Sequence, residues 1–242
     1  PHPQGSVGET LAIHPAVIVA GVFEEEIRAW EGIPQSYECT EFLNFGQEKK
    51  TASRLWILPA FAHPMATSTL LPGHGEMHQK WMKQYAHMAV LTAMLHDQTK
   101  GKVEPVDKLG LKLHYWPNQA DSQELHWGLK ACSRLLFAAG AKQVLIPSYP
   151  VLVLNHLQEI DKIDSYPLSK ERFKLTAVHP MATVPMSDDP TISAVDSSGK
   201  YLHVKGLWIA DGSLFPTSIG GPPQISIYSL GLHVGRKIIH DV

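Results

Sequence analysis

Residues 206–242 read GLWIADGSLFPTSIGGPPQISIYSLGLHVGRKIIHDV. Residues 206–211 are mostly apolar and end on an acid, which predicts a short buried strand. A bridge rich in Gly, Pro and Ser follows, and Pro222 and Pro223 then stand at a helix start, where a missing N–H costs nothing. Residues 224–239 predict that helix, because apolar side chains recur at helical spacing: Ile225, Tyr228, Leu232, Gly235/Arg236 and Ile239. The N-terminus of such a helix presents free N–H groups and a positive dipole end to an anionic group.

Working outward from this stretch, four motifs occur in a fixed order. They are HPMAT at 179–183, ADGS at 210–213, FPTS at 215–218, and a Gly-x-x-Pro-x turn at 220–224 that leads into the last helix. This set resembles the carboxyl-terminal signature of the glucose–methanol–choline (GMC) flavoprotein oxidoreductases. It is most similar to the cholesterol oxidase and long-chain alcohol oxidase branches.

The resemblance implies FAD as the cofactor and transfer of a hydride from a CH–OH group to flavin N5. In that family a strand–GxGxxG–helix unit holds the ADP half of the flavin. We find no such unit, since Gly5-Ser-Val-Gly8 lacks the third glycine. We therefore expect this chain to be a carboxyl-terminal segment whose partner is an amino-terminal FAD-binding chain or segment. Residues 11–15 resemble the L-x-x-H-P sequence that follows the flavin domain in the family.

The composition excludes several other classes of protein. The 242 residues carry a formal net charge of −2, which gives no reason to expect nucleic acid or an anionic membrane surface as a partner. No apolar run approaches the roughly 20 residues that a membrane span requires. Two cysteines, Cys39 and Cys132, make neither a disulfide framework nor a metal site.

The remaining patterns predict an α+β fold, with an antiparallel sheet covered by helices on one face. Strands are expected at 11–23, 36–45 and 54–61. Residues 86–97 are compatible with a helix or a strand, but a glycine turn at 99–102 and clean alternation at 111–116 favour a hairpin that reads strand, glycine turn, strand, strand. Helices are expected at 76–85 and 121–139, the second N-capped by Asp121 and ended by Gly140. We expect residues 1–175 to form a substrate-binding domain, and residues 176–242 to form the last strand, turn and helix of an α/β FAD-binding domain.

His179 is the candidate catalytic residue. In the resembled family this position is an active-site histidine that faces the flavin, and an imidazole can accept the hydroxyl proton of an alcohol near neutral pH. The family places Asn or His immediately before the proline of the terminal turn, whereas this chain has Pro222, which offers no side-chain donor. Either another residue, such as a histidine or Gln224, supplies the second contact to the substrate hydroxyl, or the chemistry differs from ordinary alcohol oxidation.

Four residues are candidate cofactor contacts: Asp211, Gly212, Pro223 and Gln224. The resemblance implies that Asp211 lies toward the ribityl–pyrophosphate part of FAD and that the dipole of the last helix stabilises the reduced flavin. An Asp that only caps its own turn is the simpler alternative for Asp211. We predict no metal site, because His74 and His78 lie around a Pro-Gly-His-Gly loop without an HExxH motif.

These observations predict an oxidoreductase that acts on a lipophilic or sterol-like alcohol, with His179 as the base. Because of Pro222, two alternatives stay open: lyase or decarboxylase chemistry on the same scaffold, and a non-catalytic subunit. The pentapeptide HPMAT also occurs at 63–67, but the flanking residues do not repeat, so we interpret the second copy as a coincidence.

Overall fold

The computed structural model describes residues 7–33, 35–43, 53–60, 63–107 and 110–241. The chain forms two compact units. The sheet unit comprises residues 15–95 and 119–176, and the terminal unit comprises residues 1–14, 96–118 and 177–242. The chain thus leaves the terminal unit twice and returns to it twice. The assignment of residues 1–175 and 176–242 to a substrate domain and a cofactor domain stays a prediction.

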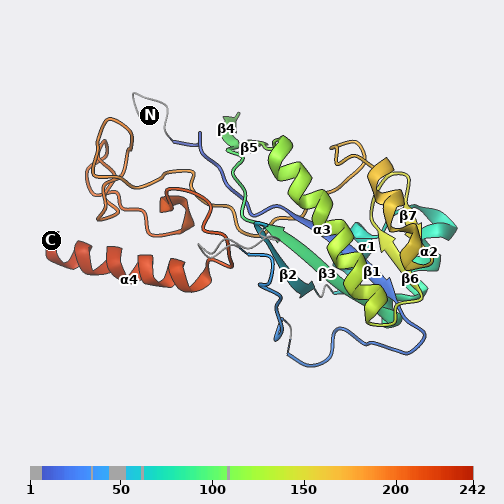
Figure 1. Cartoon of the computed structure of the whole chain (residues 1–242). Helices are drawn as coiled ribbons and strands as arrows, with labels where there is room; N and C mark the ends of the chain where they lie inside the picture. The colour runs from blue at the N-terminus through green and yellow to red at the C-terminus, as the bar shows by residue number, and fades with distance from the viewer. Residues whose placement is uncertain (1–6, 34, 44–52, 61–62, 108–109, 242) are drawn as a thin grey trace. The chain divides into compact units, whose positions relative to one another are not determined.

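The sheet unit is built on five strands in the order β2-β3-β1-β6-β7, each antiparallel to its neighbours (Figure 1). Their bounds are β1 Ala16–Val22, β2 Leu55–Ala60, β3 Met88–Leu95, β6 Gln143–Ile146 and β7 Leu152–Leu154. The central strand β1 is buried along most of its length, as its run of apolar β-branched residues predicts. The expected mixed fold with an antiparallel sheet is confirmed.

Helix α3 (Gln119–Ala138) crosses one face of this sheet and contacts β1, β2, β3 and β6 (Figure 1). Gly128 permits the close approach, because a Cβ atom there would lie 2.8 Å from the Cβ of Ala93 on β3. The 3₁₀ helix η2 (Leu157–Ser165) packs against α3. The other helices of the unit are α1 (Pro64–Leu70), α2 (Gly75–Lys83) and the 3₁₀ turn η1 (Tyr85–His87).

Alternation along β1 divides the core between the two faces of the sheet. Val17 and Val19 belong to the cluster under α3, whereas Ala20 and Val22 pack with Trp81 of α2. The sheet is therefore covered on both faces, and the expectation of helices on one face only was wrong.

The terminal unit contains a two-stranded hairpin, β4 (Lys102–Val106) with β5 (Gly110–His114), a 3₁₀ turn η3 (Gly212–Leu214) and the last helix α4 (Gln224–Asp241). Val234 is the buried residue of α4, and Ile227, Leu230 and Ile238 pack beside it. The apolar row that the sequence marked as the periodic face is instead exposed: Ile225 by 79%, Tyr228 by 65%, Leu232 by 58% and Ile239 by 77%.

Two expected strands are wrong. Residues 206–211 form turns and a single bridge between Trp208 and Lys200, because their backbone pairs locally with residues 199–201 instead of entering a sheet. In the described part of 36–45, Cys39 and Leu43 make isolated bridges only, and residues 44–45 lie outside the described residues. The three strands expected over 86–116 form as β3, β4 and β5, but no hairpin forms across the glycine turn, since β3 pairs with β1 and β2 whereas β4 pairs with β5.

Helix α3 begins two residues before the expected start. Asp121 therefore lies in its first turn instead of at the N-cap, and its fully buried carboxylate forms an ion pair with Arg54 at 2.8 Å. At the other end, Gly140 takes φ +101°, the left-handed conformation expected of a residue that ends a helix.

Candidate functional site

The terminal unit gathers a cluster of polar side chains around His14. This residue has a positive φ of 49° and an imidazole that is 1% exposed. The carboxylate of Asp97 holds the turn, because it accepts the backbone N–H groups of Ile13 and His14 at 3.2 and 3.3 Å. The hydroxyl of Tyr115 donates to the same carboxylate at 2.7 Å. A buried acceptor thus fixes the backbone from which the imidazole projects.

The protonation of the His14 ring is set by the terminal turn. The backbone N–H of Gly220 donates to His14 Nε2 at 3.1 Å, so Nε2 is an acceptor and the proton of the neutral ring is on Nδ1. Burial lowers the pKa of His14 from 6.5 to about 4, and the nearby rings of His179 and His96 act in the same direction, against Asp97. His14 is therefore a neutral imidazole at physiological pH.

His179 lies next to this ring, with the two ring centroids 5.5 Å apart and the planes at 81°. Its strand-like segment is fixed on both sides. Met181 pairs with Ala12 through two backbone hydrogen bonds of 2.9 and 3.0 Å, and the N–H of Ala182 donates to the carbonyl of Gly212 at 3.1 Å. Burial lowers the pKa of His179, which keeps this ring neutral and able to accept a proton at neutral pH.

Unsatisfied polar atoms concentrate at this place. Within the described residues, five buried side-chain polar atoms lack a hydrogen-bond partner, and three of them belong to the terminal unit: His14 Nδ1, His179 Nδ1 and Ser218 Oγ. Such atoms are rare in native proteins and typically mark a water, a ligand or a catalytic role. Two neighbouring imidazoles that each have an unpartnered nitrogen are therefore the strongest candidate site in the described chain.

The terminal turn closes against a third histidine. His96 Nε2 donates to the carbonyl of Ser218 at 3.0 Å. Gly220 has φ +79°, and a Cβ atom there would lie 2.8 Å from His96 Nδ1. Only glycine combines this conformation with this close approach, so the turn holds both His96 and His14 in place.

Two predicted cofactor contacts lie at η3. Asp211 is exposed, and its Oδ1 accepts both the N–H and the hydroxyl of Ser213, which is the turn cap that the simpler alternative proposes. Gly212 is buried next to the segment of His179. A Cβ atom at Gly212 would make ordinary contacts at 3.4–3.7 Å, so packing within the described chain does not require a glycine there.

The other two predicted contacts lie at the start of α4. Pro223 is buried and its carbonyl accepts the N–H of Ile227 at 2.8 Å, whereas Gln224 is exposed and its amide donates to the Tyr228 hydroxyl at 2.6 Å. The first turn of α4 contains no acidic residue. The amides of that turn have no partner within the helix, so they remain available to an anionic group.

Sequence reasoning missed His14 as a site residue. Its signal was the L-x-x-H-P motif at 11–15, which was interpreted only as a domain connection. Within the described residues no group of three or more His, Cys, Asp or Glu side chains is arranged to hold a metal ion. His78 instead bonds the carbonyl of Ser68 through Nε2 at 2.8 Å.

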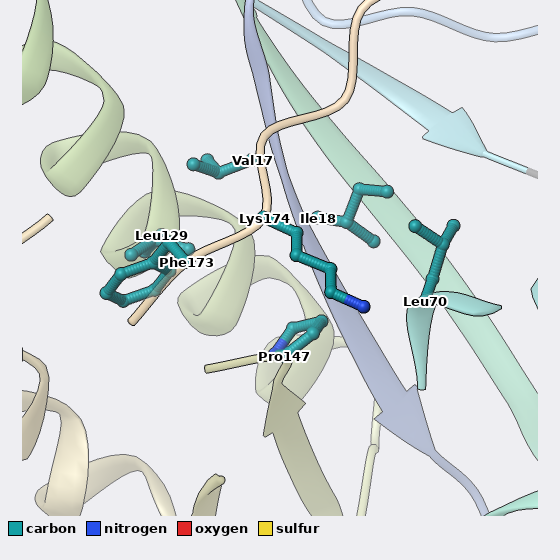
Figure 2. A pocket seen from close by; sticks show the side chains of 7 residues that line it. All are labelled: Val17, Ile18, Leu70, Leu129, Pro147, Phe173 and Lys174. Carbon is teal, nitrogen blue, oxygen red and sulfur yellow. The ribbon is translucent and has the colours of Figure 1, made fainter. Parts of the chain in front are cut away.

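Two surface hollows lie among the described residues of the sheet unit. Figure 2 shows the smaller one, where Phe173 and Leu129 lie on one side and Lys174 reaches across toward Leu70. Its free volume of about 10 Å³ admits roughly one water molecule. The wider one, of about 320 Å³, is lined mainly by loops that include His74, Tyr149 and Arg172. Neither contains any of the predicted site residues.

Comparison with known proteins identifies the class. The family model described as GMC oxidoreductase matches residues 98–231, which is more than half of the chain. The chain therefore belongs to the GMC oxidoreductases, a family of flavoproteins whose members bind FAD.

Two curated relatives show what share of a family member's length this chain covers. An uncharacterised GMC-type oxidoreductase of Mycobacterium tuberculosis is 31% identical over all of this chain and 37% of its own length. The long-chain-alcohol oxidase FAO4A of Arabidopsis thaliana is 27% identical over 97% of this chain and 34% of its own length. The chain thus spans about a third of the length of the curated relatives that it matches.

Solved structures agree on the fold. Pyridoxine 4-oxidase of Mesorbium loti aligns with a TM-score of 0.62 at 16% identity, over 98% of this chain and 44% of that one. A variant of the formate oxidase of Aspergillus oryzae aligns with a TM-score of 0.65 at 14% identity, over 98% and 48%. Within the described residues no helix has the length and apolar character needed to cross a membrane.

Proposed function

We propose that the protein containing this chain is an FAD-dependent oxidoreductase that oxidises a CH–OH group, with His179 as the base. One observation carries the proposal: the Nδ1 atom of His179 is buried without a partner, next to a second imidazole, in a family that binds FAD. A buried ring nitrogen of this kind is suited to receive a proton from a bound molecule.

The residues present fit FAD. Asp211 keeps a second carboxylate oxygen beyond its turn cap, Gly212 admits close approach, and the first turn of α4 offers amides without a competing acid. FAD would supply the acceptor that takes the hydride and its two electrons from the substrate carbon. His179 would take the hydroxyl proton, which leaves a carbonyl as the product, and its neutral form at pH 7 is what this transfer requires.

The exposed row on α4 supports the proposed partner. Ile225, Tyr228, Leu232 and Ile239 form an apolar stripe that the terminal unit does not cover. Exposed apolar stripes of this kind mark interaction surfaces. We infer that the amino-terminal FAD-binding chain or segment with its GxGxxG turn covers this stripe, since the chain spans only about a third of the relatives it matches.

The proposed substrate is a lipophilic alcohol. The similarity to FAO4A, a long-chain-alcohol oxidase by name, supports a long-chain primary alcohol over a sterol. Pro222 favours one second candidate, lyase or decarboxylase chemistry on the same scaffold, because it removes the family's usual second side chain. A screen of alcohols against cyanohydrins and fatty acids, in the dark and in the light, distinguishes the two candidates, because only lyase or decarboxylase chemistry would convert the latter two.

The experiment measures anaerobic reduction of FAD in the purified holoenzyme by long-chain primary alcohols. His179→Ala is expected to slow reduction by roughly 10²–10⁴-fold, the usual contribution of a general base. His240→Ala is the matched control, because His240 is exposed near the end of α4, outside the cluster. Equal reduction rates in the wild type and His179→Ala would end the assignment of His179, and lack of FAD in every preparation would end the proposed function.

A further inference from the structure

Pro222 offers no side-chain donor for the family's second substrate contact, so another group has to supply that contact in this chain. Gln224, one of the two alternatives from the sequence, donates its amide to the Tyr228 hydroxyl. His96 donates its Nε2 proton to the carbonyl of Ser218. Both groups are therefore engaged in bonds within the terminal unit.

His14 is the group that remains. Its Nε2 accepts the N–H of Gly220, which places its proton on Nδ1, and Nδ1 is buried without a partner. The ring lies 5.5 Å from that of His179, centroid to centroid, and the side chain is 1% exposed. A buried donor that is held in place, has no partner and lies next to the proposed base is free to bind a ligand group there.

We propose that His14 is a second catalytic residue, whose Nδ1–H donates to the substrate oxygen while the hydroxyl of the same substrate donates to Nδ1 of His179. This inference rests on the proposed function and deepens it. One hydroxyl group satisfies both orphaned nitrogens, because a hydroxyl accepts and donates at once.

The arrangement favours the transition state of oxidation. As His179 removes the proton, negative charge builds on the substrate oxygen, and a preorganised N–H donor in a buried site stabilises that charge. His14 keeps its proton throughout and acts only as a donor. Burial supports this role, because it makes the neutral, Nδ1-protonated ring the stable form over the working pH range.

The surrounding residues orient this donor. Asp97 binds the backbone N–H groups of Ile13 and His14, and Gly220 binds the opposite side of the ring. The ring is therefore held at its backbone and at Nε2, which leaves only Nδ1 available to a ligand.

Two substitutions distinguish the role of Nδ1 as a donor from the role of Nε2 as an acceptor. In His14→Asn the amide N–H group occupies the place of Nδ1, and asparagine tolerates the positive φ of 49° at this position. In His14→Gln the amide oxygen reaches the place of Nε2 and can accept the Gly220 N–H, but the donor at Nδ1 is lost. The proposal expects flavin reduction to slow by about 10²–10³-fold in His14→Gln, the usual cost of one such donor, and far less in His14→Asn.

The outcomes distinguish this inference from the proposed function. If His179→Ala slows reduction but His14→Gln does not, His14 is not the donor and the proposed function stands. If neither variant slows reduction, neither His14 nor His179 has its proposed role, whereas only the lack of FAD or of any flavin reduction by alcohols would end the proposed function. If both His14 variants slow reduction equally while FAD content and melting temperature stay at the wild-type value, the Nδ1 donor is not the active feature. Ser218 Oγ is the other buried atom without a partner in this unit. If Ser218→Ala slows flavin reduction as much as His14→Gln does, and His14→Asn is as slow as His14→Gln, the contact belongs to Ser218 and the proposal for His14 is overturned.

A second measurement does not depend on activity. In holoenzyme labelled with ¹⁵N-histidine, the long-range proton–nitrogen spectrum reports which ring nitrogen carries the proton. The His14 signals, assigned by their disappearance in His14→Asn, are expected to show protonated Nδ1 and unprotonated Nε2 from pH 8 down to about pH 5, because burial holds its pKa near 4. A proton on Nε2, or a charged ring at neutral pH, would overturn the proposal.

Discussion

The backbone N–H of Gly220 donates a 3.1 Å hydrogen bond to Nε2 of His14, although the two residues are 206 positions apart in the sequence. This contact joins the beginning of the chain to the turn before its last helix. It fixes the tautomer of a buried imidazole and closes the terminal unit around the proposed site.

The first prediction concerns stability against pH. The folded pKa of His14 is about 4, below the ordinary value of 6.5, so the unfolded state binds more protons between these two values. The stability that the neutral, buried His14 ring contributes is fully present above pH 6.5 and is lost as the pH falls to 4. The loss amounts to about 3 kcal/mol of unfolding free energy.

Denaturant unfolding of the wild type and His14→Asn at pH 7.5 and pH 4.5 checks this. The variant is expected to show a smaller pH dependence, because its residue 14 no longer titrates. The lowered pKa of His179 adds a loss in the same direction, and both proteins retain it. An equal loss of unfolding free energy between pH 7.5 and pH 4.5 in the two proteins would contradict a titration of His14 in this range.

The second prediction concerns the terminal turn. Gly220→Ala is expected to destabilise the protein by about 1–2 kcal/mol from the left-handed backbone, and by roughly 1–3 kcal/mol more from the collision of its Cβ atom with His96. Gly206→Ala is a matched control, because Gly206 has a similar φ of +78° and open space around it. The difference in melting temperature between the two variants measures the cost of the contact between the new Cβ atom and His96. An equal decrease in melting temperature in both variants would contradict that cost.

The third prediction concerns the buried ion pair of Arg54 and Asp121 in the sheet unit. Arg54→Ala leaves a carboxylate that is 0% exposed without this cation, so a loss of about 3–5 kcal/mol is expected. The pair of Lys142 and Glu24 is 64% and 80% exposed, so Lys142→Ala is expected to cost less than about 1 kcal/mol. Chemical denaturation of the two variants measures both losses of unfolding free energy. Similar losses would show that burial does not strengthen the dependence of Asp121 on Arg54.

The fourth prediction concerns the two cysteines. Burial raises the pKa of the Cys132 thiol to about 12, so its reactive thiolate is essentially absent near pH 8. Cys39 is only half-buried. An aromatic disulfide reagent is therefore expected to label one thiol of the native protein, at Cys39, and both after unfolding. Labelling of Cys132 at the same rate as Cys39 would indicate that the core under α3 opens readily.

Local patterns predicted the elements whose burial follows their own periodicity. Strands β1, β2 and β3 and helices α2, α3 and α4 all form near the expected residues. The strand expected at 206–211 fails because an apolar run specifies burial but not a pairing partner, and the nearest partner is the turn at 199–201. The helix expected at 224–239 forms, but its apolar row lies exposed: α4 is apolar on two sides, and periodicity alone does not say which side the terminal unit covers.

His179 and the four cofactor positions came from a family motif, and their roles remain proposals. His14 was not found, because its importance depends on a backbone N–H donated from Gly220 and on a neighbouring ring from residue 179. Neither contact leaves a trace in the residues next to His14.

The repeated pentapeptide HPMAT separates what the sequence determined from what the tertiary structure decided. At 63–67 it begins helix α1, and His63 caps that helix by accepting the N–H of Met65 at 3.3 Å. At 179–183 it is not helical: Met181 pairs with Ala12 in an isolated bridge, and Ala182 takes the left-handed φ of +61°. The sequence by itself determined the family, the central strands and the long helices, because these depend on local pattern and motif. Only the tertiary structure decided that one copy of the pentapeptide starts a helix and the other does not, because hydrogen bonds from distant segments outweigh the small local preference that both copies share.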